Sequence, residues 1–127
     1  EPLANAFIDQ LSGGELQRAL IAMVLAQDTE YILLDEPLNN LDMKHAVEIM
    51  RLLRKLVDEE GKTIVLVLHD LNFASGYSDH IVSLKDGRFL RQGNAQEIIT
   101  TDSLREIYDM DIDIREIDGT RFCIYFK

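Results

Sequence analysis

A strand, helix, strand pattern between residues 31 and 68 constrains the fold of this chain most strongly. The apolar run Tyr31–Leu34 ends in two carboxylates and then Pro37, which cannot continue a strand. A second apolar run covers residues 63–68. Between them, residues 42–60 repeat apolar side chains at helical spacing, and Gly61 follows as a helix C-cap. This connection length predicts a right-handed βαβ unit with parallel strands, and therefore an α/β fold.

The ends of these two strands carry residues suited to phosphate chemistry. Asp35 and Glu36 follow the first strand, and His69 follows the second. Parallel strands end at one edge of a sheet, where open α/β sheets bind ligands. Asp35 is suited to hold Mg²⁺ directly or through water, and Glu36 to orient or deprotonate an attacking water. Taken singly, the same residues are also typical of a solvated acidic turn and a loop histidine.

A second feature is the segment Leu11-Ser12-Gly13-Gly14-Glu15, which precedes a helical pattern. Ser12 and Glu15 have the spacing of a capping box, which predicts a well-formed helix start and about three helical turns. Free amides on that first turn favour an anion such as phosphate, although a capped loop without a ligand has the same pattern. The face expected to be buried carries Leu16, Leu20, Met23 and Val24. The residues expected to stay in water are Glu15, Gln17, Arg18 and Gln27.

In their order along the chain, these motifs resemble those of the ATP-binding subunits of ABC transporters, from about Asp9 to Arg91. Residues 11–15 with Gln17 resemble the signature motif. Tyr31 to Asp35 resembles the Walker B strand, with Glu36 at the catalytic glutamate and His69 at the switch histidine. The dipeptide Leu41-Asp42 falls on the D-loop, where Asn39-Asn40 replaces the more usual Ser-Ala or Thr-Ser. Residues 70–72 and 78–82 are similar to those of importers of iron-siderophore complexes or vitamin B12.

The resemblance implies a partial P-loop NTPase (RecA-like) core in which two subunits stack head to tail around ATP. The signature residues Ser12, Gly13, Gly14, Glu15 and Gln17 would then serve ATP held by the partner subunit. Asp35 with Mg²⁺, Glu36 and His69 would act on ATP held by their own subunit, and Asp42 would communicate across the dimer. Hydrolysis would drive membrane permeases, which implies a peripheral subunit at the cytoplasmic face of the cell membrane.

The sequence contains no glycine-rich phosphate loop of the type that the resemblance requires. Gly61-Lys62-Thr63 is the nearest candidate, but Leu56 occupies the position of the required glycine, and the segment follows a helix and opens a strand. We therefore expect the Walker A loop, the adenine-stacking aromatic residue and the Q-loop upstream of Glu1, where no initiator methionine stands. The chain is then the carboxyl-terminal half of a longer protein, and alone it should neither hydrolyse ATP nor bind it tightly.

Within one domain, we expect residues 1–28 to end a helical subdomain, residues 29–93 to belong to the catalytic core, and residues 94–127 to form an α+β region. Asp86-Gly87 predicts a hairpin between residues 80–84 and 88–92. Residues 94–97 have another capping spacing and predict a short helix, which residues 103–108 continue. Asp118-Gly119 predicts a turn in a terminal hairpin with alternating apolar residues.

The composition excludes several classes of function. The chain of 127 residues carries a net charge of −10 and no basic stripe, so nucleic acid is not an expected partner. No apolar stretch approaches the roughly 20 residues that span a bilayer. A single cysteine, Cys123, lies in a predicted strand and excludes an internal disulfide. His45 and His80 are expected to be surface residues.

Two other functions remain open on sequence grounds. One is a soluble ABC-type ATPase without a permease, acting in translation or DNA maintenance. The other is a non-enzymatic dimerisation or regulatory module. Sheet edges that an absent strand would normally pair are also a plausible route to self-association.

Overall fold

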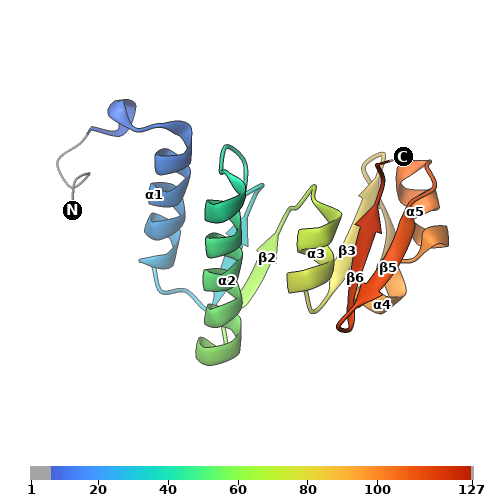
Figure 1. The fold of residues 1–127 in the computed structure, drawn as a ribbon. Helices are drawn as coiled ribbons and strands as arrows, with labels where there is room; N and C mark the ends of the chain where they lie inside the picture. The colour runs from blue at the N-terminus through green and yellow to red at the C-terminus, as the bar shows by residue number, and fades with distance from the viewer. Residues whose placement is uncertain (1–6, 127) are drawn as a thin grey trace. The chain divides into compact units, whose positions relative to one another are not determined.

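The predicted βαβ unit is present in the computed structural model, which describes residues 7–126. Strand β1 (Tyr31–Leu34) pairs in parallel with β2 (Thr63–Leu66), and helix α2 (Met43–Glu60) connects them (Figure 1). The second strand ends at Leu66 rather than at residue 68 as predicted. The reason is that β1 ends at Leu34, whose carbonyl accepts a final hydrogen bond from the Val67 amide at 3.0 Å.

Helix α2 begins and ends where the sequence predicts. Asp42 is the N-cap, and its carboxylate accepts a hydrogen bond from the His45 amide at 2.9 Å. Gly61 is the C-cap with a φ of 65°, a left-handed conformation that glycine adopts without steric cost. The buried face of the helix carries Ala46, Ile49, Met50 and Leu53. Local sequence signals therefore fix both ends of the connection that places Glu36 and His69.

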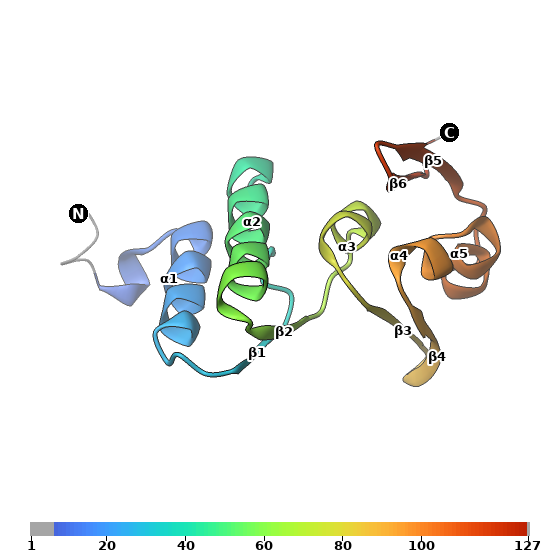
Figure 2. The ribbon, with the colours of Figure 1, turned by 90° about the horizontal axis from the view of Figure 1, so that it is seen from below.

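The two faces of the β1–β2 pair differ in their exposure to solvent. Ile32 and Leu34 are buried, whereas Tyr31 and Leu33 are exposed. Successive side chains of a strand point to opposite faces, so one whole apolar face of this pair remains uncovered. Figure 2 shows α1 and α2 on a single side of β1 and β2.

Helix α1 (Gly13–Leu25) follows a short 3-10 helix, Ile8–Gln10. Its predicted start is confirmed, and its predicted buried face is partly wrong: Leu16 and Val24 are partly buried as expected, but the other two residues are not. Leu20 and Met23 are exposed, and Ile21 is the buried residue of the helix. Gln17, expected to stay in water, is partly buried, and its side chain donates to the Pro37 carbonyl at 3.1 Å. Because positions four residues apart share a helix face, this bond turns Ile21 inward.

The chain divides into two compact units, residues 1–69 and residues 70–127. The subdivision expected at residues 28/29 and 93/94 stays a prediction. The helices of the second unit are α3 (Leu71–Tyr77), α4 (Ala95–Ile98) and α5 (Thr101–Tyr108). Its strands are β3 (Ile81–Lys85), β4 (Arg88–Gly93), β5 (Asp113–Ile117) and β6 (Thr120–Ile124).

Both predicted hairpins of this unit are confirmed. Strands β3 and β4 pair antiparallel around Asp86-Gly87, and β5 and β6 pair around Asp118-Gly119. All four turn residues have positive φ, as two-residue turns with the twist of the flanking strands require. The predicted capping box at Asn94 is also present and starts α4. Helix α5 begins at Thr101, before the predicted residue 103, because the Thr100 side chain caps it.

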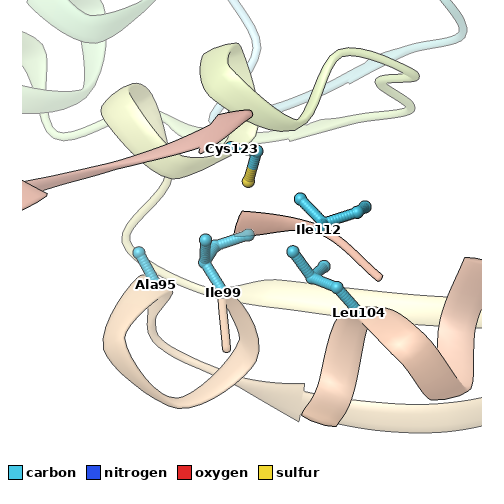
Figure 3. Packing of buried hydrophobic residues seen from close by; sticks show 5 residues of the cluster. All are labelled: Ala95, Ile99, Leu104, Ile112 and Cys123. Carbon is cyan, nitrogen blue, oxygen red and sulfur yellow. The ribbon is translucent and has the colours of Figure 1, made fainter. Parts of the chain in front are cut away.

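The core of the second unit lies between its helices and the terminal hairpin. Figure 3 shows the buried side chains of its central cluster: Ala95, Ile99, Leu104, Ile112 and Cys123. Cys123 lies in β6 as predicted, and burial raises the pKa of its thiol to about 11. It is therefore a packed, protonated side chain rather than a nucleophile.

Polar bonds join the elements of this unit around the core. Asn72 of α3 accepts from the Cys123 amide at 2.7 Å, which attaches α3 to β6. Lys85 of β3 binds Asp109, which follows α5, at 2.7 Å, and Arg91 of β4 binds Glu106 at 2.6 Å. In the part of the chain that the structure describes, no helix combines the length and the apolar character that crossing a bilayer requires.

Candidate functional site

The adjacent ends of β1 and β2 bring together two residues that lie 33 positions apart in the sequence. The ring Nε2 of His69 lies 2.5 Å from Oε1 of Glu36. The side chain of His69 is 73% exposed and that of Glu36 is 35% exposed, so a ligand in solution can reach both. The prediction that a parallel strand pair brings His69 to the acidic pair is confirmed.

Glu36 occupies an unusual backbone conformation. Its φ is +46°, a left-handed value that a residue with a long side chain rarely adopts. The turn after it is closed by a hydrogen bond from the Asn39 amide to the Glu36 carbonyl at 3.1 Å, and Pro37 inside the turn is fully buried. Strained conformations of this kind persist where surrounding structure holds them, often at functional sites.

Hydrogen bonds to both carboxylate oxygens hold the side chain of Glu36. His69 faces Oε1, and the side-chain amide of Asn39 donates to Oε2. The bond from His69, followed by that from Asn39, holds the pKa of Glu36 below its usual range. Glu36 is therefore an oriented, ionised acceptor at neutral pH, as an activator of water should be.

Asp35 lies directly beyond the end of β1 with an exposed side chain. Among residues 7–126, no group of three or more His, Cys, Asp or Glu side chains could enclose a metal ion. Mg²⁺, however, is commonly bound by one or two carboxylates together with waters and phosphate oxygens. A single accessible carboxylate at a sheet edge fits that mode, and it does not fit a metal cage made of protein alone.

The N-terminus of α1 has free hydrogen-bond donors. Ser12 and Glu15 form the predicted capping box: the Ser12 amide donates to Glu15 Oε2 at 2.9 Å, and the Glu15 amide donates to Ser12 Oγ at 3.3 Å. The Ser12 hydroxyl also donates to Glu15 Oε2 at 2.7 Å, and this bond is the main cause of a lowered pKa of Glu15. The box leaves the amides of Gly13 and Gly14 for an anionic ligand, because first-turn amides have no partner within their own helix.

The same glycines lie against the loop that follows Glu36. A Cβ atom added to Gly14 would be 3.1 Å from the Asn40 carbonyl oxygen, and one added to Gly13 would be 3.4 Å from the Asn40 Cβ. With the bond from Gln17 to Pro37, these approaches place the start of α1 against residues 37–41 of the same chain. The pattern S-G-G therefore permits close backbone packing as well as ligand access.

Asp42 is held in place at the start of α2. Its Oδ1 accepts from the His45 amide, and its Oδ2 lies 2.9 Å from Nδ1 of His45. The backbone bond from His45 is the largest cause of a lowered pKa of Asp42. His45 lies at the surface as predicted, with a side chain that is 33% exposed, and it also engages Asp42.

The segment 61–63 ends a helix and opens a strand, which confirms the prediction that it is not a phosphate loop. Gly61 ends α2, and Thr63 opens β2. The Nζ of Lys62 lies 2.6 Å from Oδ1 of Asp28 and holds the pKa of that carboxyl below its usual range. This lysine therefore joins the loop after α1 to the start of β2.

Sequence reasoning missed Asn39 and His45 as parts of the site. Each lies three residues after an acidic residue that it contacts: Asn39 after Glu36, and His45 after Asp42. The signal for Asn39 was available, because asparagine in a turn often bonds to nearby groups. The signal for His45 was weaker, because its contact depends on the start of α2 at residue 43.

Comparisons with known proteins agree on one family. A family model described as "ABC transporter" matches residues 1–39, the stretch that carries the signature-like loop and the acidic pair. The petrobactin import ATP-binding protein YclP of Bacillus subtilis (strain 168) is 63% identical over 127 residues. That match covers 100% of this chain and 50% of YclP. The petrobactin import ATP-binding protein FatE of Bacillus anthracis is 49% identical over 112 residues, which cover 88% of this chain and 45% of FatE.

A solved structure confirms the predicted fold class. The ATP-binding cassette MJ0796, in a dimeric post-hydrolysis state bound to ADP and phosphate, matches with a TM-score of 0.71 and 45% identity. The match covers 75% of this chain and 40% of that one. The fold is therefore part of an ABC ATPase core of the P-loop NTPase type. The chain spans about half the length of the curated relatives it matches.

Proposed function

We propose, from the membership of this chain in the ABC transporter ATP-binding family, that it supplies the catalytic glutamate, switch histidine and signature loop of an ATP-hydrolysing subunit. The observation that carries this proposal is the bond between Glu36 and His69 at the edge of the β1–β2 pair. An ionised carboxylate that is oriented by a histidine suits the positioning of water for attack on a phosphoryl group.

In this proposal the residues divide between two ATP molecules. Glu36 and His69 act on ATP bound by their own subunit, where Glu36 accepts a proton from the attacking water. Ser12 and the amides of Gly13 and Gly14, supported by Glu15 and Gln17, bind phosphate of ATP held by a second subunit. Asp42, fixed by His45, communicates across the dimer. In this division, the backbone amides at the start of α1 bind the phosphate anion, and the carboxylate of Glu36 acts on the attacking water.

Asp35 would hold Mg²⁺, directly or through a water molecule. The bound ion would neutralise charge on the phosphate oxygens of ATP. The exposed carboxylate of Asp35 supports this role, because a hard cation with waters and phosphate oxygens needs few protein ligands.

We further propose a head-to-tail pair of these subunits working with a membrane permease at the cytoplasmic face of the cell membrane. The dimeric state of the matched cassette supports the pairing. The chain would form the carboxyl-terminal part of one nucleotide-binding domain. Alone it would be inactive, because none of its segments has the pattern of a phosphate loop with its lysine.

The substrate class follows from the printed names of the relatives. YclP and FatE are petrobactin import proteins, and petrobactin is the substrate that we propose to test first. Relatives with 47% identity include a probable siderophore transport ATP-binding protein, YusV, which supports the broader class of iron-siderophore complexes.

Uptake of radioactive iron tests this proposal in cells whose gene for the complete subunit is deleted. We expect the deletion to abolish uptake of iron-loaded petrobactin, and the wild-type gene to restore it, because import requires hydrolysis. A gene carrying Glu36→Gln should not restore uptake, whereas one carrying the exposed substitution Glu48→Gln on α2 should. Unchanged uptake of every siderophore after deletion would instead favour a soluble ATPase.

A further inference from the structure

The side chain of Asn39 contacts the carboxylate that the proposed function places in catalysis. Its amide nitrogen donates to Oε2 of Glu36, on the opposite carboxylate oxygen from His69. The backbone amide of Asn39 also donates to the Glu36 carbonyl at 3.1 Å. Asn39 therefore bonds to Glu36 through both its side chain and its backbone.

We propose that Asn39 is a positioning residue for Glu36, and this inference rests on the proposed ATPase function. With His69 at Oε1 and Asn39 at Oε2, the plane of the carboxylate is fixed from both sides. A carboxylate has about four lone-pair sites, so two bonds leave acceptor capacity for the attacking water. Asn39 thus holds the acceptor in place without occupying all of it.

The chemistry of asparagine explains why this residue type suits the position. The side-chain amide donates hydrogen bonds and carries no charge, so it supports an ionised carboxylate without forming an ion pair with it. A serine at this position would carry a shorter side chain with a hydroxyl in place of the amide. The local turn also brings Asn39 back toward Glu36, because the backbone of Glu36 is left-handed.

The surrounding structure fixes the turn on which Asn39 depends. Pro37 is fully buried, and its carbonyl accepts the bond from Gln17 of α1. Asn40 has a φ of +63° and packs against the glycines that start α1. The segment is therefore held independently of the Asn39 side chain, so removing that side chain should release the carboxylate more than it disturbs the loop.

The test uses the complete ATPase subunit with substitutions Asn39→Ala, Asn39→Gln and Asn39→Asp. We expect Asn39→Ala to lower kcat about 10-fold, the effect of losing one hydrogen bond to a charged group, with little change in KM for ATP. Asn39→Gln keeps the amide and should recover part of the loss. Asn39→Asp should lower kcat about 100-fold, because a second carboxylate repels Glu36 from its position.

The variant Asn39→Asp distinguishes a role of Asn39 in positioning Glu36 from a role in the structure of the loop alone. Asp and Asn favour the same turn conformations, so a purely structural role predicts wild-type kcat for Asn39→Asp. Asn94→Ala is the matched control, because Asn94 also bonds to a glutamate three residues later, in the capping box of α4 in the second unit. We expect that control to keep wild-type kcat.

Two outcomes distinguish this inference from the proposed function. If Glu36→Gln hydrolyses ATP normally, the proposed function fails. If Glu36→Gln is inactive but Asn39→Ala and Asn39→Asp both retain wild-type kcat, the positioning role of Asn39 alone is wrong. Melting temperatures of all variants show whether any loss comes from unfolding, and in the Glu36→Gln background Asn39→Ala should have no further effect.

Discussion

Replacement of Glu36 by glutamine in the complete subunit is expected to lower kcat for ATP hydrolysis by about 10²–10⁴-fold, the range for loss of a general base. Glutamine has nearly the same size and can still bond to His69 and Asn39, but it cannot accept a proton from water. The loss should therefore appear in the chemical step, with nucleotide binding retained. Steady-state phosphate release and binding of a fluorescent ATP analogue measure the two effects separately.

The same substitution should stabilise the ATP-bound dimer, since separation of the subunits depends on hydrolysis in this proposal. Size-exclusion chromatography with ATP should show a dimer for Glu36→Gln and mostly monomer without nucleotide. Glu48→Gln, which removes an exposed carboxylate on α2, is the control and should resemble wild type in both measurements. Hydrolysis by Glu36→Gln at the wild-type rate would contradict the assigned role.

Replacement of Leu104 by alanine should cost about 2–5 kcal/mol in free energy of unfolding, the range for a large aliphatic side chain deleted from a core. Leu104 has no exposed surface and lies in the cluster with Ile99, Ile112 and Cys123 (Figure 3). The loss combines the removed apolar contacts with the cavity that remains. Urea denaturation of the complete subunit, with hydrogen exchange of amides in residues 70–127, locates the effect.

Met110→Ala is the matched control for that measurement. Met110 is 43% exposed and lies in the loop between α5 and β5, so its truncation should change stability by less than about 1 kcal/mol. Equal effects of the two substitutions would mean that the cluster around Leu104 does not stabilise this unit.

Local signals made much of the fold predictable. The ends of α2 follow from Asp42 and Gly61, and both hairpins follow from their Asp-Gly turns, because caps and turns depend on residues a few positions apart. The meeting of Glu36 and His69 was predictable for a different reason: parallel strands of a βαβ unit end at one sheet edge.

Contacts between distant segments were not predictable from one sequence. The periodicity of α1 allowed several apolar stripes, and the inward position of Ile21 depends on the bond from Gln17 to Pro37, 20 residues away. The approach of Gly14 to the Asn40 carbonyl likewise depends on tertiary packing. Asparagine in a turn indicated a local bond, but the choice of Glu36 as the partner of Asn39 depends on the left-handed backbone of Glu36, which no local pattern indicates.

The central claim is that the signature loop and the Glu36 site of one chain serve different ATP molecules, and mixed dimers test it most directly. One subunit carries Glu36→Gln. The other carries Gly13→Asp, which places a negative charge where phosphate should bind while suiting the start of a helix. Each variant alone should be inactive. A mixed dimer, however, contains one intact site, made from Glu36 of one subunit and the signature loop of the other.

Random pairing should therefore restore about a quarter of wild-type hydrolysis when equal amounts are mixed, because half of the dimers are mixed and each has one working site of two. Phosphate release from the mixture, compared with each variant alone, is the measurement. Recovered activity would support the shared-site arrangement. A mixture as inactive as its components would contradict it.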